Sequence, residues 1–214
     1  MIIWLNGQFG GGKTAVAQEL CERDESFVLF DTEEVGQMLR HALDVRRPVN
    51  DFQDWPAWRT LVVATAIELV AYLECDLVIP QSVFAHAYWN ELTTGFASAE
   101  LAMRAFTLLV HPEEHERRIL QDVNEPDAAD WRLSKIADFE NALPWLERET
   151  TVIDTTSRTP AEVASFILEE LANTRLESQE PDKSTAQGSA TGTDSVRLVI
   201  SSNAYPDVWP RVLC

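Results

Sequence analysis

The residues with the clearest chemistry form one run near the start of the chain, GQFGGGKT at positions 7–14. It fits the pattern G-x-x-x-x-G-K-[ST] of a phosphate-binding loop, or P-loop. Glycines let successive backbone N–H groups curl closely around phosphate oxygens. Lys13 can reach the β- and γ-phosphates of ATP and act in catalysis, and the Thr14 hydroxyl can bind Mg²⁺. The predicted ATP-binding residues here are Gly7, Phe9, Gly10, Gly11, Gly12, Lys13, Thr14 and Ala15.

A glycine-rich turn can match this pattern by chance, so the flanking sequence decides between the two interpretations. Residues 2–5 are an apolar run that is typical of a buried strand. Val16, Ala17 and Leu20 follow at helical spacing, which predicts a helix. The positive end of that helix would face the phosphates. We therefore favour a P-loop.

The composition excludes several classes of protein. The 214 residues are 45% hydrophobic and carry a net charge of −18, which repels nucleic acids and anionic membrane surfaces. The three cysteines are odd in number and widely spaced, so neither a disulfide framework nor a metal site is expected. We also expect no signal peptide and no transmembrane helix, since no window approaches about 18 uninterrupted apolar residues. A cytoplasmic protein follows.

Apolar runs alternate with helical patterns along the chain, which predicts an α/β fold. Such a fold has a parallel sheet with right-handed crossovers and helices on both faces. Asp31, Gln81 and His111 then fall at the carboxyl ends of strands, where ligands gather. The predicted strands are 2–5, 27–30, 77–79, 106–110 and 151–153, and the predicted helices follow the P-loop and Asp31, cover 57–73, begin at 112, and cover 131–143 and 160–172.

Three local patterns make more specific predictions. Residues 27–30 are continuously apolar, as in a strand buried on both faces. Met38 and Ala42 share an apolar stripe with Val35 and should face inward. Pro144 should mark the end of the helix that precedes it.

Two further stretches are distinctive: DFQDWPAWR at 51–59 and VIP at 78–80. Together with the opening run, they resemble the bacterial tunicamycin resistance protein family, which is P-loop kinase-like and similar to chloramphenicol phosphotransferase and to shikimate and adenylate kinases. The resemblance spans residues 1–172. It implies a five-stranded sheet in the order 2-3-1-4-5, a kinase-like lid, and ATP-dependent handling of a small molecule, often a nucleoside-type antibiotic. The chain departs from the family in having fewer lid cations and no recognisable basic C-terminal helix.

The composition changes near residue 177. Residues 177–194 are rich in Ser, Thr, Gly and Gln and contain no aromatic residue, as in a flexible linker. We therefore predict a P-loop kinase-like domain over residues 1–176 and a flexible tail over 177–214.

Asp31 is the favoured catalytic carboxylate. It follows an apolar strand, and in similar kinases the acid at this place binds the acceptor hydroxyl and can take its proton. Helix N-capping is the alternative, because the sequence DTEE at 31–34 suits a first helical turn. We favour catalysis because a carboxylate at the carboxyl end of a strand lies where ligands bind.

The acceptor is expected to contact Arg40 and Arg59, since an arginine offers a planar fork to anionic or carbonyl oxygens. A surface ion pair is an equally good interpretation of Arg40. Phe52 and Trp58 can stack on a ring, although clustered tryptophans are more often core residues. The predicted substrate-binding residues are Asp31, Arg40, Phe52, Gln53, Trp58, Arg59 and Gln81.

The segment after the fourth strand should supply lid cations. One of Arg117 and Arg118 should face the nucleotide, and Arg132 or Lys135 should stabilise the charge that develops in transfer. A solvated helix face is the alternative, because acidic residues surround them. Arg118 and Arg132 are the predicted catalytic lid residues, and Arg117, Arg118 and Thr156 are predicted to contact the nucleotide.

These expectations describe a phosphotransferase that uses ATP and Mg²⁺ and acts on a hydroxyl of a small molecule. No carboxylate follows the third strand, so Thr14, phosphates and water should hold the Mg²⁺. The favoured acceptor is a nucleoside-type antibiotic or its precursor. Two alternatives stay open: an ATP-gated protein that sequesters the antibiotic without catalysis, and a housekeeping nucleotide or metabolite kinase. The acceptor, the choice between ATP and GTP, and the oligomeric state, a homodimer included, also stay open.

Overall fold

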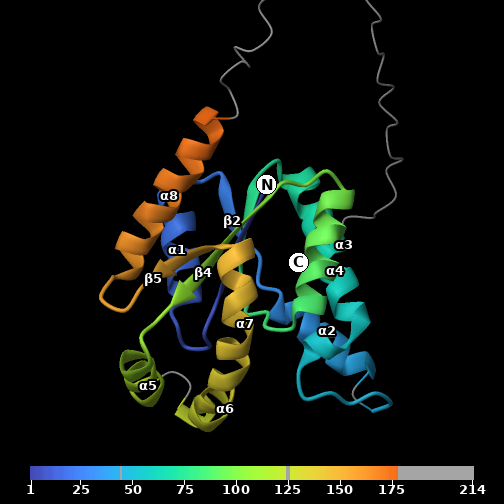
Figure 1. The fold of residues 1–214 in the computed structure, drawn as a ribbon. Coiled ribbons are helices and arrows are strands. Elements are labelled where there is room, and N and C mark those ends of the chain that lie inside the picture. Colours follow the sequence, from blue (N-terminus) through green and yellow to red (C-terminus); the bar gives the residue numbers. More distant parts are fainter. Residues whose placement is uncertain (44, 124–125, 178–214) are drawn as a thin grey trace, which may run out of the picture.

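The computed structural model describes residues 1–43, 45–123 and 126–177 (Figure 1). Its five strands lie parallel in one sheet in the order β2-β3-β1-β4-β5, so the predicted α/β fold and strand order are confirmed. The predicted tail lies outside the described residues from 178 onward. The strands are β1 (Ile2–Gly7), β2 (Phe27–Leu29), β3 (Asp76–Pro80), β4 (Met103–Leu109) and β5 (Thr151–Asp154).

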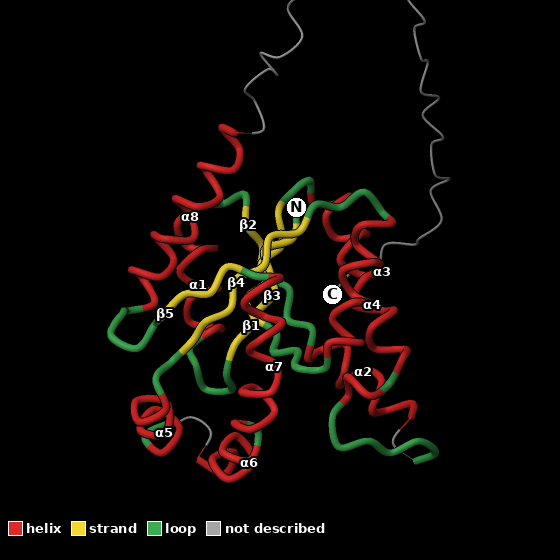
Figure 2. Tube along the Cα trace, viewed as in Figure 1, coloured by secondary structure: helices red, strands yellow, loops and turns green. Residues whose placement is uncertain are grey.

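Helices cover both faces of the sheet (Figure 2). In β1, Ile2 and Trp4 pack toward one face, while Ile3 and Leu5 pack toward the other, because successive side chains of a strand point in opposite directions. The first face is covered by α2 (Glu33–Leu43), α3 (Pro56–Leu73), α4 (His86–Ser98) and α7 (Ile136–Glu149), and the second by α1 (Lys13–Arg23) and α8 (Pro160–Glu177).

The remaining helices lie at the end of the sheet where the strands terminate. Figure 1 shows α5 (Pro112–Leu120) and α6 (Ala129–Ser134) below the carboxyl ends of β4 and β5. Two short 3₁₀ helices complete the set: η1 (Phe52–Asp54) and η2 (Pro126–Ala128). We call η2 and α6 the lid segment. In a parallel sheet this edge is where ligands bind, so these elements frame the site.

Three local predictions are wrong, each for a reason of packing. β2 is an edge strand paired only with β3, so Leu29 is 37% exposed rather than buried. Met38 and Ala42 are exposed, because α2 buries the stripe of Val35 and Leu39 instead. Helix α7 continues through Pro144 and ends at Glu149.

Two helices also differ from the prediction: one was not predicted, and the other is longer than predicted. The stretch that forms α4 was not predicted, although Trp89, Leu92 and Phe96 lie at helical spacing and are buried. Helix α8 opens with the expected capping box, in which Thr159 N donates to Glu162 Oε2 at 2.8 Å and Glu162 N donates to Thr159 Oγ1 at 3.3 Å. It then continues to Glu177, five residues past the predicted end.

One helix of the described residues, α3, is long and apolar enough by length and composition alone to cross a membrane. The core helix of a globular domain passes the same test. In this chain α3 packs on the sheet through Trp58, Val62 and Ala66, and it carries the buried charged residue Arg59. A buried arginine is costly in hydrocarbon, while 22% of this helix is buried among the described residues.

Candidate active site

The P-loop wraps between β1 and α1 with glycines at positions that other residues tolerate poorly. Gly7, Gly10 and Gly12 have φ values of +135°, +77° and +94°. At Gly7 an added Cβ would lie 2.4 Å from the Leu108 carbonyl oxygen. Positive φ and close backbone approach both favour glycine. The loop is therefore pressed against β4 just ahead of the N-terminus of α1.

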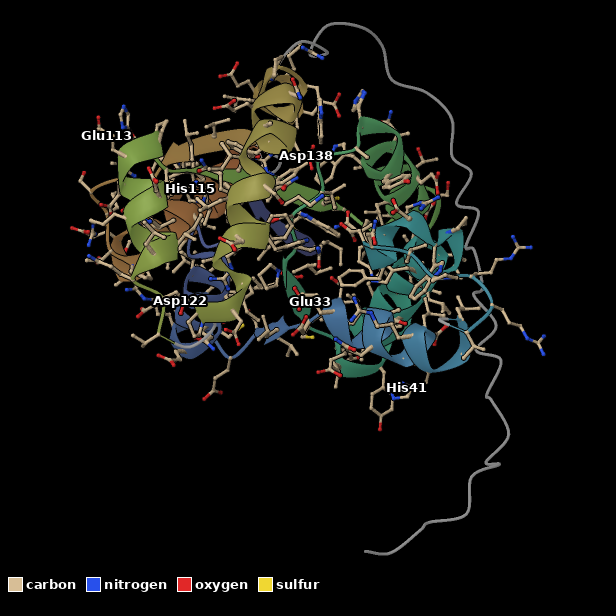
Figure 3. All side chains as sticks on the ribbon, turned by 90° about the horizontal axis from the view of Figure 1, so that it is seen from below. Glu33, His41, Glu113, His115, Asp122 and Asp138 are labelled. Atoms are coloured by element: carbon tan, nitrogen blue, oxygen red, sulfur yellow. The ribbon has the colours of Figure 1, made fainter. Side chains whose placement is uncertain are left out.

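Two buried polar side chains fix the loop from beneath. Gln8 Oε1 accepts from Val110 N at 2.8 Å, and Gln8 Nε2 donates to Val110 O at 3.2 Å. His115 Nε2 lies 2.7 Å from the Phe9 carbonyl and must donate to it, so Nδ1, 3.4 Å from Gln8 Nε2, is the acceptor. Burial lowers the pKa of His115. Figure 3 shows His115 on the inner side of α5, with Glu113 on its outer side. The sequence analysis missed this support.

Lys13 lies in the mouth of the loop. Its Nζ donates to Gln8 O at 2.8 Å and Gly7 O at 3.2 Å, and it is 9% exposed. Burial lowers the pKa of Lys13 to about 7, against a raising effect of Glu33, and Arg132 lowers it further. Phosphate oxygens would replace the two carbonyls as acceptors and favour the charged ammonium.

A cavity of about 800 Å³ opens beside Lys13, between the P-loop, α2, the loop before η1, and the lid segment. It brings together many of the residues singled out from the sequence, although they are far apart along the chain. Predicted residues that line it are Phe9, Gly10, Lys13, Thr14, Asp31, Arg40, Phe52, Gln53, Gln81 and Arg132. Lining residues that the sequence analysis did not assign include Glu33, Gln37, Asp51, Ser82, Asp127 and Trp131.

Two carboxylates enter the cavity from the turn after β2. Asp31 Oδ1 accepts from the backbone N–H of Glu33 at 2.9 Å, which is the capping contact named as the alternative. Asp31 is also exposed and lines the cavity. Glu33 was missed, yet its charge acts directly on Lys13. Figure 3 shows Glu33 at the start of α2, on the side facing the lid segment. Both acids are therefore candidates to receive a proton from an acceptor hydroxyl.

A hydrogen-bonded floor joins the end of β3 to η1. Gln81 Oε1 accepts from Thr32 Oγ1 at 2.8 Å, and Gln81 Nε2 donates to Ser82 O at 3.1 Å. Gln53 Nε2 donates to the same carbonyl at 2.9 Å. Ser82 Oγ donates to Gly7 O at 2.7 Å, which links this floor to the P-loop. Gln53 and Gln81 thus line the cavity with side chains already held by protein partners.

Trp58 and Arg59 do not line the cavity, contrary to their predicted contact with the acceptor. Trp58 is fully buried and donates through Nε1 to Thr32 O at 3.0 Å. Arg59 Nε pairs with Glu91 Oε2 at 2.6 Å, and the guanidinium carbon lies 4.1 Å from the ring centre of Tyr88. Its Nη1 also donates to the Gln53 carbonyl. Both residues therefore support the cavity wall from the protein interior, through their hydrogen bonds to the backbone of Thr32 and Gln53.

Arg117 and Arg118 also lie outside the cavity. Both pair with Glu114, whose pKa their hydrogen bonds lower to about 2. Arg118 further donates to Thr155 O at 2.9 Å and Thr156 O at 3.0 Å, while Thr156 Oγ1 accepts from His111 N at 2.9 Å. These residues tie α5 to the loop after β5. Their predicted contact with the nucleotide stays a prediction.

The lid segment touches the P-loop through an aromatic pair and one arginine. The rings of Phe9 and Trp131 meet edge to face with centres 4.6 Å apart. A Cβ at Gly10 would lie 3.8 Å from Arg132 Cδ, so this arginine lies over the glycine loop. Its Nη1 pairs with Asp122 Oδ2 at 2.6 Å. Arg132 therefore lies close to the P-loop, and its charge acts on Lys13.

The donors present fit a magnesium nucleotide. The glycine backbone and Lys13 suit phosphate oxygens, and the exposed Thr14 hydroxyl with the Asp31 and Glu33 carboxylates offers the hard oxygen ligands that Mg²⁺ prefers. Among the residues that the structure describes, no group of three or more His, Cys, Asp or Glu side chains is placed to hold a metal by itself.

The parallel sheet, the glycine loop between β1 and α1, and the lid segment define a P-loop kinase-like protein. The chain is similar to the tunicamycin resistance protein of Deinococcus radiodurans, with 27% identity, a TM-score of 0.63, and coverage of 80% of this chain and 95% of that one. The resemblance predicted from the sequence is thereby confirmed. No protein-family model matches the chain, and no curated protein matches it.

Two more distant structures share the fold. A gluconokinase of Sinorhizobium meliloti has 16% identity and a TM-score of 0.58, over 83% of this chain and 97% of that one. A shikimate kinase of Acinetobacter baumannii, solved with shikimate, has 18% identity and a TM-score of 0.55, over 82% and 94%. At such identities the likeness concerns the fold, and the acceptor must be argued from the cavity.

Proposed function

We propose that this protein is an ATP- and Mg²⁺-dependent phosphotransferase that phosphorylates a hydroxyl of a small molecule, favoured as a nucleoside-type antibiotic or its precursor. One observation carries the proposal: Lys13, Arg132 and the carboxylates of Asp31 and Glu33 line one cavity at the mouth of a P-loop. The likeness to a tunicamycin resistance protein supports the choice of acceptor. A cytoplasmic location and a kinase-like domain over residues 1–176 belong to the same proposal.

The chain's own residues supply positioning and charge. Lys13 and Arg132 stabilise the negative charge on the transferred phosphoryl group. Asp31 or Glu33 orients the acceptor hydroxyl and takes its proton as the new O–P bond forms and the bond to the ADP leaving group breaks. The remaining carboxylate, with the Thr14 hydroxyl, would face the Mg²⁺. Gln53, Gln81 and Phe52 shape the wall against which the acceptor lies.

The test compares Asp31→Asn and Glu33→Gln with wild type, using tunicamycin, uridine and other nucleosides as acceptors. Each amide keeps the shape of the acid but cannot take a proton. The variant that removes the base should lose ~10²–10⁴ in kcat while it still binds ATP. The product is measured by mass spectrometry and ATP affinity by calorimetry. Glu34→Gln is the matched control, because Glu34 is an exposed neighbour on α2 that does not line the cavity.

The same experiment separates the proposal from antibiotic sequestration. A sequestering protein would bind tunicamycin and give a host full resistance with no phosphorylated product in wild type or in either variant. That outcome would exclude the kinase proposal. Turnover of a common nucleoside or nucleotide with a kcat/KM far above that of any antibiotic would instead indicate a housekeeping kinase.

A further inference from the structure

The cavity is lined by more acidic than basic side chains. Two of the three lining cations, Lys13 and Arg132, lie at the P-loop, and the third, Arg40, lies on α2. The lining acids come from the turn after β2, the loop before η1 and the lid segment, and the charge of Glu33 acts on Lys13. The lining carboxylates are Asp31, Glu33, Asp51 and Asp127.

The two P-loop cations offer little charge to an acceptor. Lys13 donates to the carbonyls of Gly7 and Gln8, and phosphates would occupy it in the loaded site. Arg132 is already paired with Asp122 at 2.6 Å. A magnesium–ATP complex is itself negative overall, so the loaded phosphate end would repel a second anion rather than attract it.

Apart from Lys13 and Arg132, Arg40 is the one cation among the described residues that line the cavity, against four lining carboxylates. Asp51 is half-buried, with Oδ1 accepting from Gln53 N at 2.9 Å. Burial raises the pKa of Asp51, while Lys135 and Arg40 act to lower it. Lys135 pairs with Asp138 at 3.0 Å and does not line the cavity. Arg40 and Asp51 thus act on each other electrostatically. With one of Asp31 and Glu33 facing the Mg²⁺, the other acid and Asp127 leave excess negative charge for an acceptor to meet.

Resting on the proposed phosphotransfer, we infer that the acceptor is an uncharged or positively charged hydroxylated molecule, and not a carboxylic or phosphoric acid. Recognition of an acid calls for a bidentate cation at the acceptor end, whereas like charges brought together cost several kcal/mol of binding. Carboxylates suit hydroxyl and ammonium donors. Leu29, Phe52 and Trp131 add apolar surface to the cavity wall for a ring.

Matched ligand sets test the inference by binding, without relying on turnover. The first set is 5′-amino-5′-deoxyuridine, uridine and uridine 5′-monophosphate, and the second is glucosamine, glucose and gluconate. Each is titrated by calorimetry into the full chain with Mg²⁺ and a saturating non-hydrolysable ATP analogue, and again without nucleotide. In both sets the anion should bind at least roughly tenfold more weakly than its amine. An anion that binds as tightly, or three ligands that cannot be told apart, would overturn the inference.

Charge-neutral variants connect that preference to the named acids. Asp51→Asn and, separately, Asp127→Asn should reduce the gap between amine and anion, which is the ratio of the anion's Kd to the amine's Kd, since each variant removes one lining charge. Asp138→Asn is the matched control outside the cavity and should leave the gap unchanged. If both cavity variants keep the wild-type gap, these acids do not set the preference and the inference fails.

The proposed phosphotransfer and the inferred charge preference can be refuted separately. If amines bind more tightly than anions but no compound is phosphorylated, the proposed phosphotransfer fails while the charge preference stands. If ATP-dependent product forms and the acids are the better acceptors by kcat/KM, the phosphotransfer stands and the inference about the acceptor is wrong.

Discussion

The two ends of the cavity are built in different ways. The phosphate end is built largely from one continuous run, residues 7–14, whose shape depends on its glycines. The acceptor end is assembled from the start of α2, residues 50–53, the end of β3 and the lid segment. The first is specified locally, and the second depends on packing between distant segments. Acceptor choice can therefore change while nucleotide binding is kept.

The sharpest way to separate the two ends is Lys13→Ala. It removes the one side chain that the loop motif directs at the β- and γ-phosphates, so product formation should fall by at least about 10²–10³-fold. Acceptor affinity, measured by calorimetry, should stay close to wild type. Lys183→Ala is a matched control that lies outside the described residues. Wild-type turnover in Lys13→Ala would remove the basis for the nucleotide site.

Arg59→Ala should damage the acceptor end and spare the phosphate end. The buried guanidinium holds the Gln53 carbonyl and Glu91, and losing hydrogen bonds from a charged donor costs about 1.5–3 kcal/mol of unfolding free energy. The acceptor KM should rise because Phe52 and Gln53 lose their support, while ATP affinity should change little. Denaturant unfolding and steady-state kinetics measure the two effects.

Arg23→Ala provides the comparison for that variant. Its exposed pair with Glu19 should be worth about 0–1 kcal/mol. If Arg59→Ala were no more destabilising than Arg23→Ala, or if it weakened ATP binding as strongly as acceptor binding, the proposed division of the cavity would be wrong.

A smaller effect probes the phosphate end alone. Because burial lowers the pKa of Lys13 to about 7, the free protein at pH 8 holds this lysine mostly neutral. Phosphates favour the charged form, so binding of a magnesium–ATP analogue at pH 8 should take up close to one proton, and affinity should fall as pH rises above 7. Calorimetry in buffers of different ionisation enthalpy measures the uptake. Lys13→Arg, which stays charged, should lack it; equal uptake in both proteins would contradict the assignment.

The smallest effect is expected outside both ends. Ending the chain after Glu177 removes residues that the sequence marks as a polar linker and tail, while the described residues already form an apolar cluster on each face of the sheet. The unfolding midpoint and ATP affinity should therefore stay at wild-type values. Loss of cooperative unfolding, followed by circular dichroism, would show that residues 178–214 contribute to the domain.

Strand order and the P-loop were predictable because their signals are local or come with the family resemblance. Burial along β2 was not, since its sequence has the apolar run of a central strand while only β3 pairs with it. Which strand lies at the edge depends on pairing between distant segments. Pro144 was misread for a similar reason: Trp145 and Leu146 are buried beyond it, and this packing carries α7 past a residue that usually ends a helix.

At the acceptor end, residue type was predictable but orientation was not. Asp31 and Glu33 both follow β2, and only the first turn of α2 shows that both acids enter the cavity. The sequence predicts that Arg59, one residue after Trp58, contacts the acceptor. In the structure its guanidinium instead turns toward Glu91 on α4. Since α4 itself was not predicted, the partner that removes Arg59 from the cavity was not visible in the sequence.

The edge-to-face contact of Phe9 with Trp131 has a consequence for the timing of the reaction cycle. Aromatic pairs of this kind are worth about 0.5–1.5 kcal/mol, and this one joins the glycine loop to the lid segment. On the proposed function, a shift of Phe9 when phosphates bind or leave would disturb the indole. Nucleotide exchange should therefore register as a change in tryptophan fluorescence, and the release of ADP should proceed no faster than these two rings rearrange.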